Sequence, residues 1–386
     1  MRTLILATTA ALALAACGRE AASEKTEGAA SAPGAPNQLA VTPAAAAPAM
    51  QTENRTFRDW RVVCDNGNAC VAWTGGDGGW LRVAIQPGPG QVPSIETGSW
   101  SLGEVGEDAP ALTLLIDGRQ RQPRAGPQNA ANAQDHADRM RRIVAEIAQA
   151  KTIALASSSQ REAIPATGAA AAFLWIDERQ GRLDTTGALM RRGARPDSAV
   201  PTAPPLPRVT PARAVDQGAF RGAENPMEND PPKLAVPASL ESRTDVRECR
   251  TEGNPTLNAA TLAVKLSANT ELWGIPCGSG AYNATYKLFL TGLNGANPRP
   301  AALPERLPRR EGDIGGEGPW LVNPVYDTAA QTLTVFPRGR GLGDCGTITT
   351  WTWTGTAFAL SEERGMGDCW GISPDHWPTY WRTQRG

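Results

Sequence analysis

The chain has 386 residues and a formal net charge of −1, with 38 Lys and Arg residues against 39 Asp and Glu residues. Because no basic block interrupts this balance, we expect no nucleic-acid partner. The 40 glycines, the 32 prolines and the 20% share of charged residues are typical of a loop-rich exported protein, and the length allows two domains.

The N-terminus has the pattern of an export signal. A basic start at Arg2 precedes an apolar run that is too short to span a bilayer and ends in Leu-Ala-Ala-Cys-Gly at residues 14–18. This ending resembles the lipobox of bacterial lipoproteins, which implies a signal peptide over residues 1–16 and a lipid on Cys17 that anchors the chain to a membrane. Glycine rather than aspartate at position 18 implies, by the same resemblance, the outer membrane. The alternative is an ordinary secretory signal with an incidental cysteine.

A low-complexity segment follows. Residues 17–54 are mainly Ala, Pro, Glu, Ser and Gln, without an aromatic side chain. Such a segment cannot bury enough apolar surface to fold by itself, so we predict a disordered tether between the lipid and the first domain.

Residues 55–193 predict an α+β domain. Residues 57–66 and 70–73 alternate apolar and polar side chains around an Asn/Gly turn, as in a β-hairpin. Two helices are expected, one with its N-cap at Asn132 and one over residues 169–177. We interpret Arg179 and Arg182 as charges that complement the dipole at the end of the second helix, with a partner contact as the alternative.

The second half of the chain has a different pattern. Residues 194–242 are rich in proline and poor in large apolar side chains, which predicts an interdomain linker, although a linker of this length can lie against a domain. Residues 243–386 contain short runs of β-branched and aromatic residues and no convincing helical period after Asn269. We therefore predict an all-β, mostly antiparallel second domain.

The cysteines indicate a disulfide framework. With Cys17 assigned to lipid, an even number remains, and six cysteines in an exported chain allow 15 connectivities. Proximity along the chain favours three pairs, which are Cys64–Cys70, Cys249–Cys277 and Cys345–Cys369. The alternative is a metal site, but the chain has no CxxC motif and only two histidines, so we expect no metal and no cofactor.

A short repeat is the most distinctive feature. Arg-Gly-Leu-Gly-Asp-Cys at residues 340–345 recurs as Arg-Gly-Met-Gly-Asp-Cys at residues 364–369, on either side of a predicted hairpin. The glycines do not precede a helix, so a phosphate-binding loop is not expected. Two arginines and two aspartates of the repeat could converge at one end of the hairpin and clamp a carboxylate or phosphate. These residues are Arg340, Arg364, Asp344 and Asp368. The favoured alternative is that these charges pair with one another or cap turns.

Aromatic residues near the repeat suggest a second kind of site. Trp351 and Trp353 are expected on the same side of one strand, and Tyr282 could join them. If this face is exposed, it offers a stacking platform for a sugar or a peptide. If it is covered, which is commoner for tryptophans in β domains, it is core.

Four separated motifs carry a family resemblance. They occupy residues 57–66, 176–182, 277–283 and 339–346, the last with Trp377-Pro378 downstream. Together they resemble the exported bacterial family known as domain of unknown function 1176, from about residue 55 to the C-terminus. The first domain also resembles, more weakly, the invasion-associated locus B family. The first family has no assigned activity, so the resemblance implies no catalytic residue.

The leading hypothesis is an envelope-anchored periplasmic lipoprotein that acts as a non-enzymatic binding or interaction protein. Its partner would be an envelope glycan or a protein, held at the β end of the second domain. The alternative is an enzyme that acts on envelope carbohydrate through a carboxylate pair, Asp344 and Asp368. A Ser–His–Asp hydrolase is not expected, because no Gly-x-Ser-x-Gly motif occurs.

Overall fold

The computed structural model describes residues 50–100, 102, 112–123, 132–218, 220, 224–225, 234–251, 260–304 and 321–386. The predicted signal peptide, Cys17 and nearly all of the predicted tether lie outside these residues. No helix within the described part of the chain has the length and apolar character that a membrane crossing requires.

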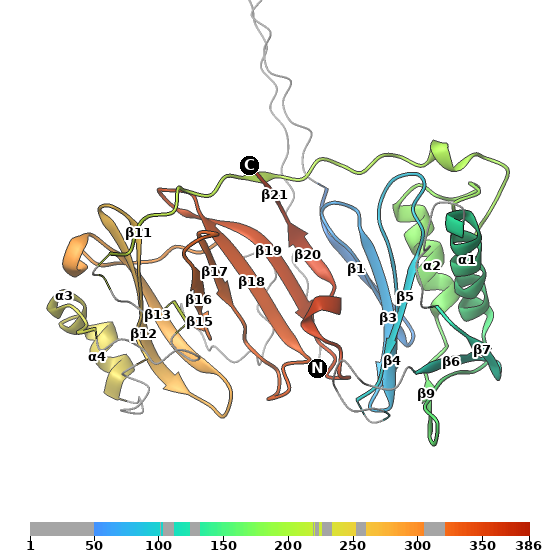
Figure 1. Ribbon diagram of the computed structural model, residues 1–386, viewed down its shortest axis with the longest axis horizontal. Helices are drawn as coiled ribbons and strands as arrows, with labels where there is room; N and C mark the ends of the chain where they lie inside the picture. Colours follow the sequence, from blue (N-terminus) through green and yellow to red (C-terminus); the bar gives the residue numbers. More distant parts are fainter. Residues whose placement is uncertain are drawn as a thin grey trace, which may run out of the picture. The chain divides into compact units, whose positions relative to one another are not determined.

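The first half begins with a five-stranded antiparallel meander, which Figure 1 shows in blue. The predicted hairpin forms its second and third strands, and Cys64 pairs with Cys70 across the turn. A second antiparallel sheet has the order β7-β6-β8-β9. The strands of the two sheets are β1 (Glu53–Phe57), β2 (Trp60–Cys64), β3 (Cys70–Gly76), β4 (Gly79–Ile85), β5 (Ser94–Gly98), β6 (Thr113–Ile116), β7 (Arg119–Arg121), β8 (Ile153–Ala156) and β9 (Arg161–Ile164).

Two helices pack on these sheets, as expected. Helix α1 (Ala133–Gln149) starts directly after Asn132, and helix α2 (Ala169–Arg179) follows β9. The apolar stripe of α1 is buried together with Phe173 of α2 and Trp60 of β2 in one core cluster. Trp60 and Phe173 meet edge to face, with ring centroids 5.2 Å apart, a geometry that aromatic pairs prefer.

The end of α2 corrects one interpretation of the sequence. Arg182 does not lie at the surface as a dipole-complementing charge; its side chain is fully buried and donates hydrogen bonds to the carbonyl groups of Gln86 and Gly88. Asp177 is buried beside it and accepts backbone N–H bonds, including those of Leu189 and Met190. Burial raises the pKa of Asp177, and these backbone hydrogen bonds oppose the rise. The segment therefore fixes the chain that follows α2.

The proline-rich segment also makes specific contacts. Strand β10 (Arg208–Val209) pairs in parallel with β21 (Gln384–Arg385) at the C-terminus. A 3-10 helix (Asp197–Ala199) and the short helix α3 (Ala238–Glu241) belong to the same stretch. The described parts of this linker thus lie against folded structure.

The second half consists mainly of two antiparallel sheets, as expected. One has the order β11-β12-β13-β14, with β15 also paired to β13, and the other is the meander from β16 to β20. The strands are β11 (Leu262–Ser267), β12 (Thr270–Ser279), β13 (Ala284–Thr291), β14 (Arg299–Pro300), β15 (Leu321–Val322), β16 (Val325–Asp327), β17 (Thr332–Val335), β18 (Gly346–Trp353), β19 (Phe358–Met366) and β20 (Thr379–Arg382). Two 3-10 turns complete this half, Leu293–Gly295 and Pro374–His376.

The helix α4 (Thr244–Thr251) was not expected, because the sequence beyond Arg243 indicated strands alone. Its residues Val246 and Cys249 are buried in a cluster with Trp273 and Phe289 of the neighbouring sheet. Cys249 is also bonded to Cys277 of β12. This short helix is therefore held by tertiary packing and a covalent bond, which outweigh its weak local signal.

The two halves of the chain share a core. Trp73 and Trp80 of the first meander pack with Ile348, Met366 and Trp377 of the last one. Residues Ala47–Gly386 accordingly form one compact unit. The three predicted cysteine pairs are confirmed, and the third, Cys345–Cys369, lies beside this shared core.

Candidate functional site

The charged residues of the repeat pair with other protein groups. Its first copy is a loop after β17, and Arg340 donates to both carboxylate oxygens of Asp344, at 2.7 and 2.5 Å. Asp344 also accepts the backbone N–H of Gly371 at 2.7 Å. Burial raises the pKa of Asp344, but the hydrogen bonds from Arg340 and Gly371 outweigh it and lower the pKa below its usual value. Both charges of the first copy are thus satisfied internally.

The second copy has different partners. Arg364 lies within β19, 3.3 Å from a carboxylate oxygen of Glu362, and donates to the carbonyl of Pro374. Asp368 pairs with Arg61 of β2 at 2.9 Å. The two aspartates are therefore each held by a different arginine. This arrangement agrees with the favoured alternative, in which the charges of the repeat pair with other protein groups rather than with a bound anion.

Trp351 and Trp353 do not form an exposed aromatic platform. Trp351 and Trp353 are each only 1% exposed and belong to the core cluster of the last two sheets. Trp351 donates its indole N–H to the carbonyl of Pro304 at 2.7 Å. Tyr282 donates its hydroxyl to Gly339 in the first repeat loop. Burial favours the core interpretation of both tryptophans.

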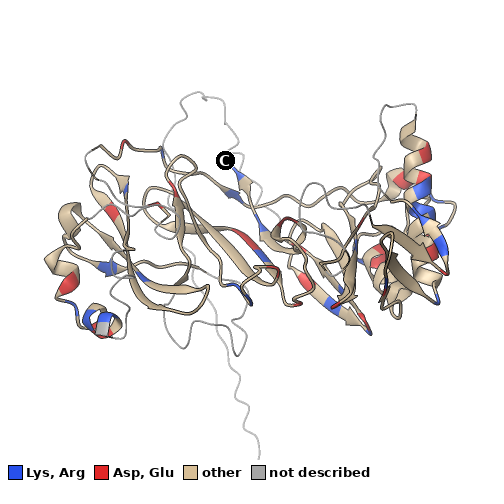
Figure 2. Ribbon diagram, turned by 60° about the horizontal axis from the view of Figure 1, so that its bottom comes forward, with Lys and Arg blue, Asp and Glu red and all other residues tan. Residues whose placement is uncertain are grey.

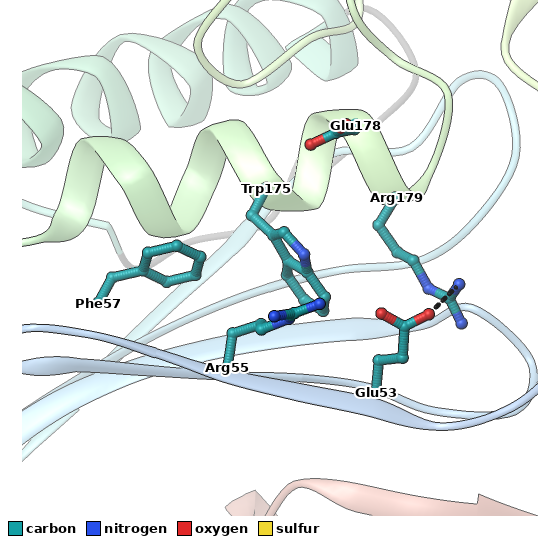
Figure 3. A pocket seen from close by; sticks show the side chains of 6 residues that line it. All are labelled: Glu53, Arg55, Phe57, Trp175, Glu178 and Arg179. Atoms are coloured by element: carbon teal, nitrogen blue, oxygen red, sulfur yellow. Dashed lines mark ion pairs between the residues drawn. The ribbon is translucent and has the colours of Figure 1, made fainter. Parts of the chain in front are cut away.

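A groove lies instead between β1 and α2, in the first half of the chain. Its cavity volume is about 480 Å³, and Figure 3 shows the six side chains that line it, Glu53, Arg55, Phe57, Trp175, Glu178 and Arg179. The first three are alternate residues of a strand, which therefore point to the same side. The others are spaced by three and four residues along a helix, so they share a helix face.

The two elements run alongside each other over their length. At one end, the backbone of Gly168, which precedes α2, lies directly against the carbonyl of Phe57. At the other end, Arg179 pairs with Glu53 at 2.7 Å and donates to the carbonyl of Gln51 at 2.6 Å. The five residues of β1 and the eleven residues of α2 span similar lengths, each roughly 17 Å. The groove is therefore bounded by a strand and an antiparallel helix.

The floor of the groove is aromatic and its rim is charged. Phe57 and Trp175 pack with ring centroids 6.4 Å apart at an angle of 48°. In Figure 3 the side chain of Arg55 extends from β1 toward the ring of Trp175. Within the described part of the chain, Arg55 and Glu178 have no ion-pair partner, whereas Glu53 and Arg179 pair with each other. Arg55 is also exposed, so it can accept an anionic group at low desolvation cost.

The sequence pattern did not predict this site, because Glu53 fell in the expected tether and, of the other lining residues, only Arg179 was considered for a partner contact. The helix expected over residues 169–177 is only partly buried, because Leu174 is 41% exposed and Trp175 is half-buried. The adjacent large apolar residues Leu174 and Trp175 could have indicated an exposed apolar side chain. Neighbouring residues on a helix point in different directions, so both cannot face the centre of the core. The alternation of charges at Glu53 and Arg55 before Phe57 was a second signal.

Outside the groove, charged residues of both signs are mixed along the described part of the chain (Figure 2). Acidic and basic residues lie interspersed along the helices and strand ends in Figure 2. The exposed residues Trp100 and Leu342 flank the paired Arg340, whose guanidinium lies 5.4 Å from the Trp100 ring centre. In the groove between β1 and α2, an aromatic surface lies beside an exposed arginine that has no ion-pair partner among the described residues.

The antiparallel sheets and the three disulfide bonds define a β-rich, disulfide-bonded protein. The family model described as "Protein of unknown function (DUF1176)" matches residues 54–384, and the chain belongs to this family. The chain is also 30% identical over 363 residues to "Uncharacterized protein YpfG" of Escherichia coli (strain K12), an alignment that covers 88% of this chain and 94% of that protein. No solved structure matches the chain.

Proposed function

We propose that the protein is a non-enzymatic binding protein of the bacterial envelope that holds a polypeptide partner in the groove between β1 and α2. The observation that carries the proposal is the exposed Arg55, which has no ion-pair partner among the described residues and lies beside the aromatic surface of Phe57 and Trp175. Aromatic side chains and arginines contribute most of the binding energy at protein interfaces. The proposed site thus moves from the second half of the chain to the first.

The enzymatic alternative has less support. Asp344 and Asp368 are bound to different arginines. The groove has two carboxylates of its own, but Glu53 is paired with Arg179, and Figure 3 shows that Glu178 does not point toward it. A glycosidase requires two carboxyl groups on either side of one bond. The arrangement of charges therefore favours binding over hydrolysis.

The envelope location is part of the proposal and rests on the N-terminal sequence. The lipobox pattern ending at Cys17 supports a lipid-anchored form, with the outer membrane favoured. Three disulfides are typical of a protein that folds in an oxidising compartment. Metabolic labelling with an alkyne fatty acid tests this location. The wild-type chain should be labelled and should sediment with membranes, whereas the Cys17→Ser variant should not be labelled and should not sediment with membranes. Equal labelling of the two would overturn the lipoprotein form.

The binding function is tested by site-specific crosslinking in the producing bacterium. A photo-crosslinking amino acid at position 55 should give a discrete polypeptide adduct that disappears when Trp175→Ala is added. The same amino acid at position 342, which is exposed in the first repeat loop, is the matched control and should not give that adduct. An adduct from position 55 that is indifferent to Trp175→Ala, or none at all, would overturn the proposed function.

A further inference from the structure

We propose that the partner binds as an added β-strand along β1, as an extended peptide whose acidic side chain pairs with Arg55. This inference rests on the proposed function of the groove and specifies the class of ligand and its mode of binding. Strand addition supplies affinity through main-chain hydrogen bonds and specificity through alternate side chains.

Strand β1 lies at the edge of its sheet. In its sheet, β1 is paired with β2 on one side and is the terminal strand. Its residues Asn54, Arg55 and Thr56 are all exposed. An edge strand presents a row of backbone donors and acceptors, which other chains can use unless the edge is protected. No proline, bulge or covering strand protects this edge among the described residues.

The register of the hairpin formed by β1 and β2 decides which backbone groups of β1 point away from β2. A two-residue turn joins Phe57 to Trp60, which are directly opposite each other, and such a turn closes with a hydrogen bond between these two residues. Hydrogen-bonded and non-hydrogen-bonded residue pairs alternate along an antiparallel ladder. Arg55, two residues before Phe57, therefore also directs its backbone N–H and C=O groups toward β2. Asn54 and Thr56 therefore point their N–H and C=O groups outward. No hydrogen bond from these groups is present within the described part of the chain.

Helix α2 offers side-chain contacts beside β1. An incoming strand at this edge would alternate its side chains as β1 does, with every second one directed to the helix side. The side chains on that side would meet Trp175 and Arg55, which lie on the same side of the sheet. A large apolar residue would pack on Trp175, and an acidic residue two positions away would reach Arg55. The occupant is thus an unfolded segment of another protein rather than a folded surface.

The experiment begins with the full chain and a displayed library of random 12-residue peptides. Enriched peptides should combine an acidic residue with a large apolar residue at even spacing. Amide hydrogen exchange should show that a synthetic peptide of this kind protects the Asn54 and Thr56 amides. N-methylation at alternate peptide positions should weaken binding at least tenfold, and N-methylation at the intervening positions should not. This readout needs no change in the protein.

Protein variants separate the backbone from the side-chain contribution. Thr56→Pro removes one outward N–H group and leaves the hydrogen bonds between β1 and β2 intact, so it should weaken peptide binding about tenfold. Thr56→Val keeps the N–H group and should bind the peptide as the wild type does. Arg55→Glu should lose affinity and regain it with a peptide whose acidic residue is replaced by lysine. Arg58→Glu, in the adjacent turn, is the matched charge control and should change affinity less than twofold.

The outcomes distinguish this inference from the proposed function. If peptides require Trp175 but bind Thr56→Pro normally and tolerate N-methylation at every position, strand addition is overturned while the groove remains a binding site. If no peptide is enriched, or if binding is indifferent to Trp175→Ala, the proposed function falls as well. If the protein instead dimerises through β1, so that Thr56→Pro yields a monomer, the edge belongs to a second copy and the inference is overturned.

Discussion

Arg61 and Asp368 form an ion pair of 2.9 Å that joins the first and the last meander of the protein. The same carboxylate accepts the indole N–H of Trp73 at 3.2 Å. Arg61 also lies over the ring of Trp370, 4.8 Å from its centre. Asp368, the aspartate of the second repeat copy, thus binds residues of the first half of the chain and helps to hold the two halves together.

Asp368→Ala should therefore destabilise the fold. It leaves the Trp73 indole N–H and the Arg61 guanidinium without their acceptor, which should lower the free energy of unfolding by about 1–3 kcal/mol. Chemical denaturation monitored by tryptophan fluorescence gives this quantity. Asp375→Ala is a suitable control because Asp375 is exposed, and its effect should stay below about 0.5 kcal/mol. Equal effects of the two substitutions would contradict the structural role.

Glu96 should make stability dependent on acid pH. Burial raises the pKa of this carboxyl, but the hydrogen bond from His376 and the charge of Arg82 outweigh it and bring the pKa to about 2. Because the folded-state pKa lies below the ordinary value of 4.5, the stabilisation is complete above pH 4.5 and is lost as the pH falls toward 2.

Glu96→Gln should consequently be less stable than the wild type by about 1–2 kcal/mol at pH 6, an amount reduced by solvent screening of these partly exposed side chains. The difference should shrink progressively between pH 4.5 and 2. Denaturation curves at a series of pH values measure it. A difference that is constant over this range would show that the ionised carboxylate does not contribute.

The disulfides should differ in their contribution to stability. Cys64–Cys70 closes a separation of 6 residues, whereas Cys249–Cys277 and Cys345–Cys369 close 28 and 24. In the chain-entropy model, paired Cys→Ala substitutions should cost about 2 kcal/mol for the short loop and about 3–4 kcal/mol for the longer ones. Urea denaturation of the three double variants tests the order, and the mass of the unreduced protein before and after alkylation tests the pairing.

Trp351 should behave as a core residue. Trp351→Ala removes a large buried side chain and should cost about 3–5 kcal/mol. Trp100→Ala, at a tryptophan that is 45% exposed, should cost less than about 1 kcal/mol. Thermal unfolding compares the two. A stable Trp351→Ala variant would argue that this side chain is retained for a role other than packing.

Local sequence patterns predicted the elements that depend on local interactions. The hairpin at Cys64 and Cys70, the helix after Asn132 and the hairpin between the repeat copies all appear where the pattern placed them. Helix α4 was missed because its stability comes from packing and a disulfide rather than from a strong apolar period. Arg182 was misinterpreted because a charged residue is rarely buried without several hydrogen-bond partners, which only the fold supplies.

The sequence by itself determined the alternation of the strands and the family to which the chain belongs, and it favoured the cysteine pairing that the structure shows. Each of these features depends on residues that are close in the chain or on the order of motifs along it. Only the tertiary structure decided that Trp351 is core, that Asp368 binds a residue of the first meander, and that Phe57 meets Trp175 beside an exposed arginine. Periodicity specifies which side of a strand or helix is apolar, but the surface that covers it is set by long-range packing.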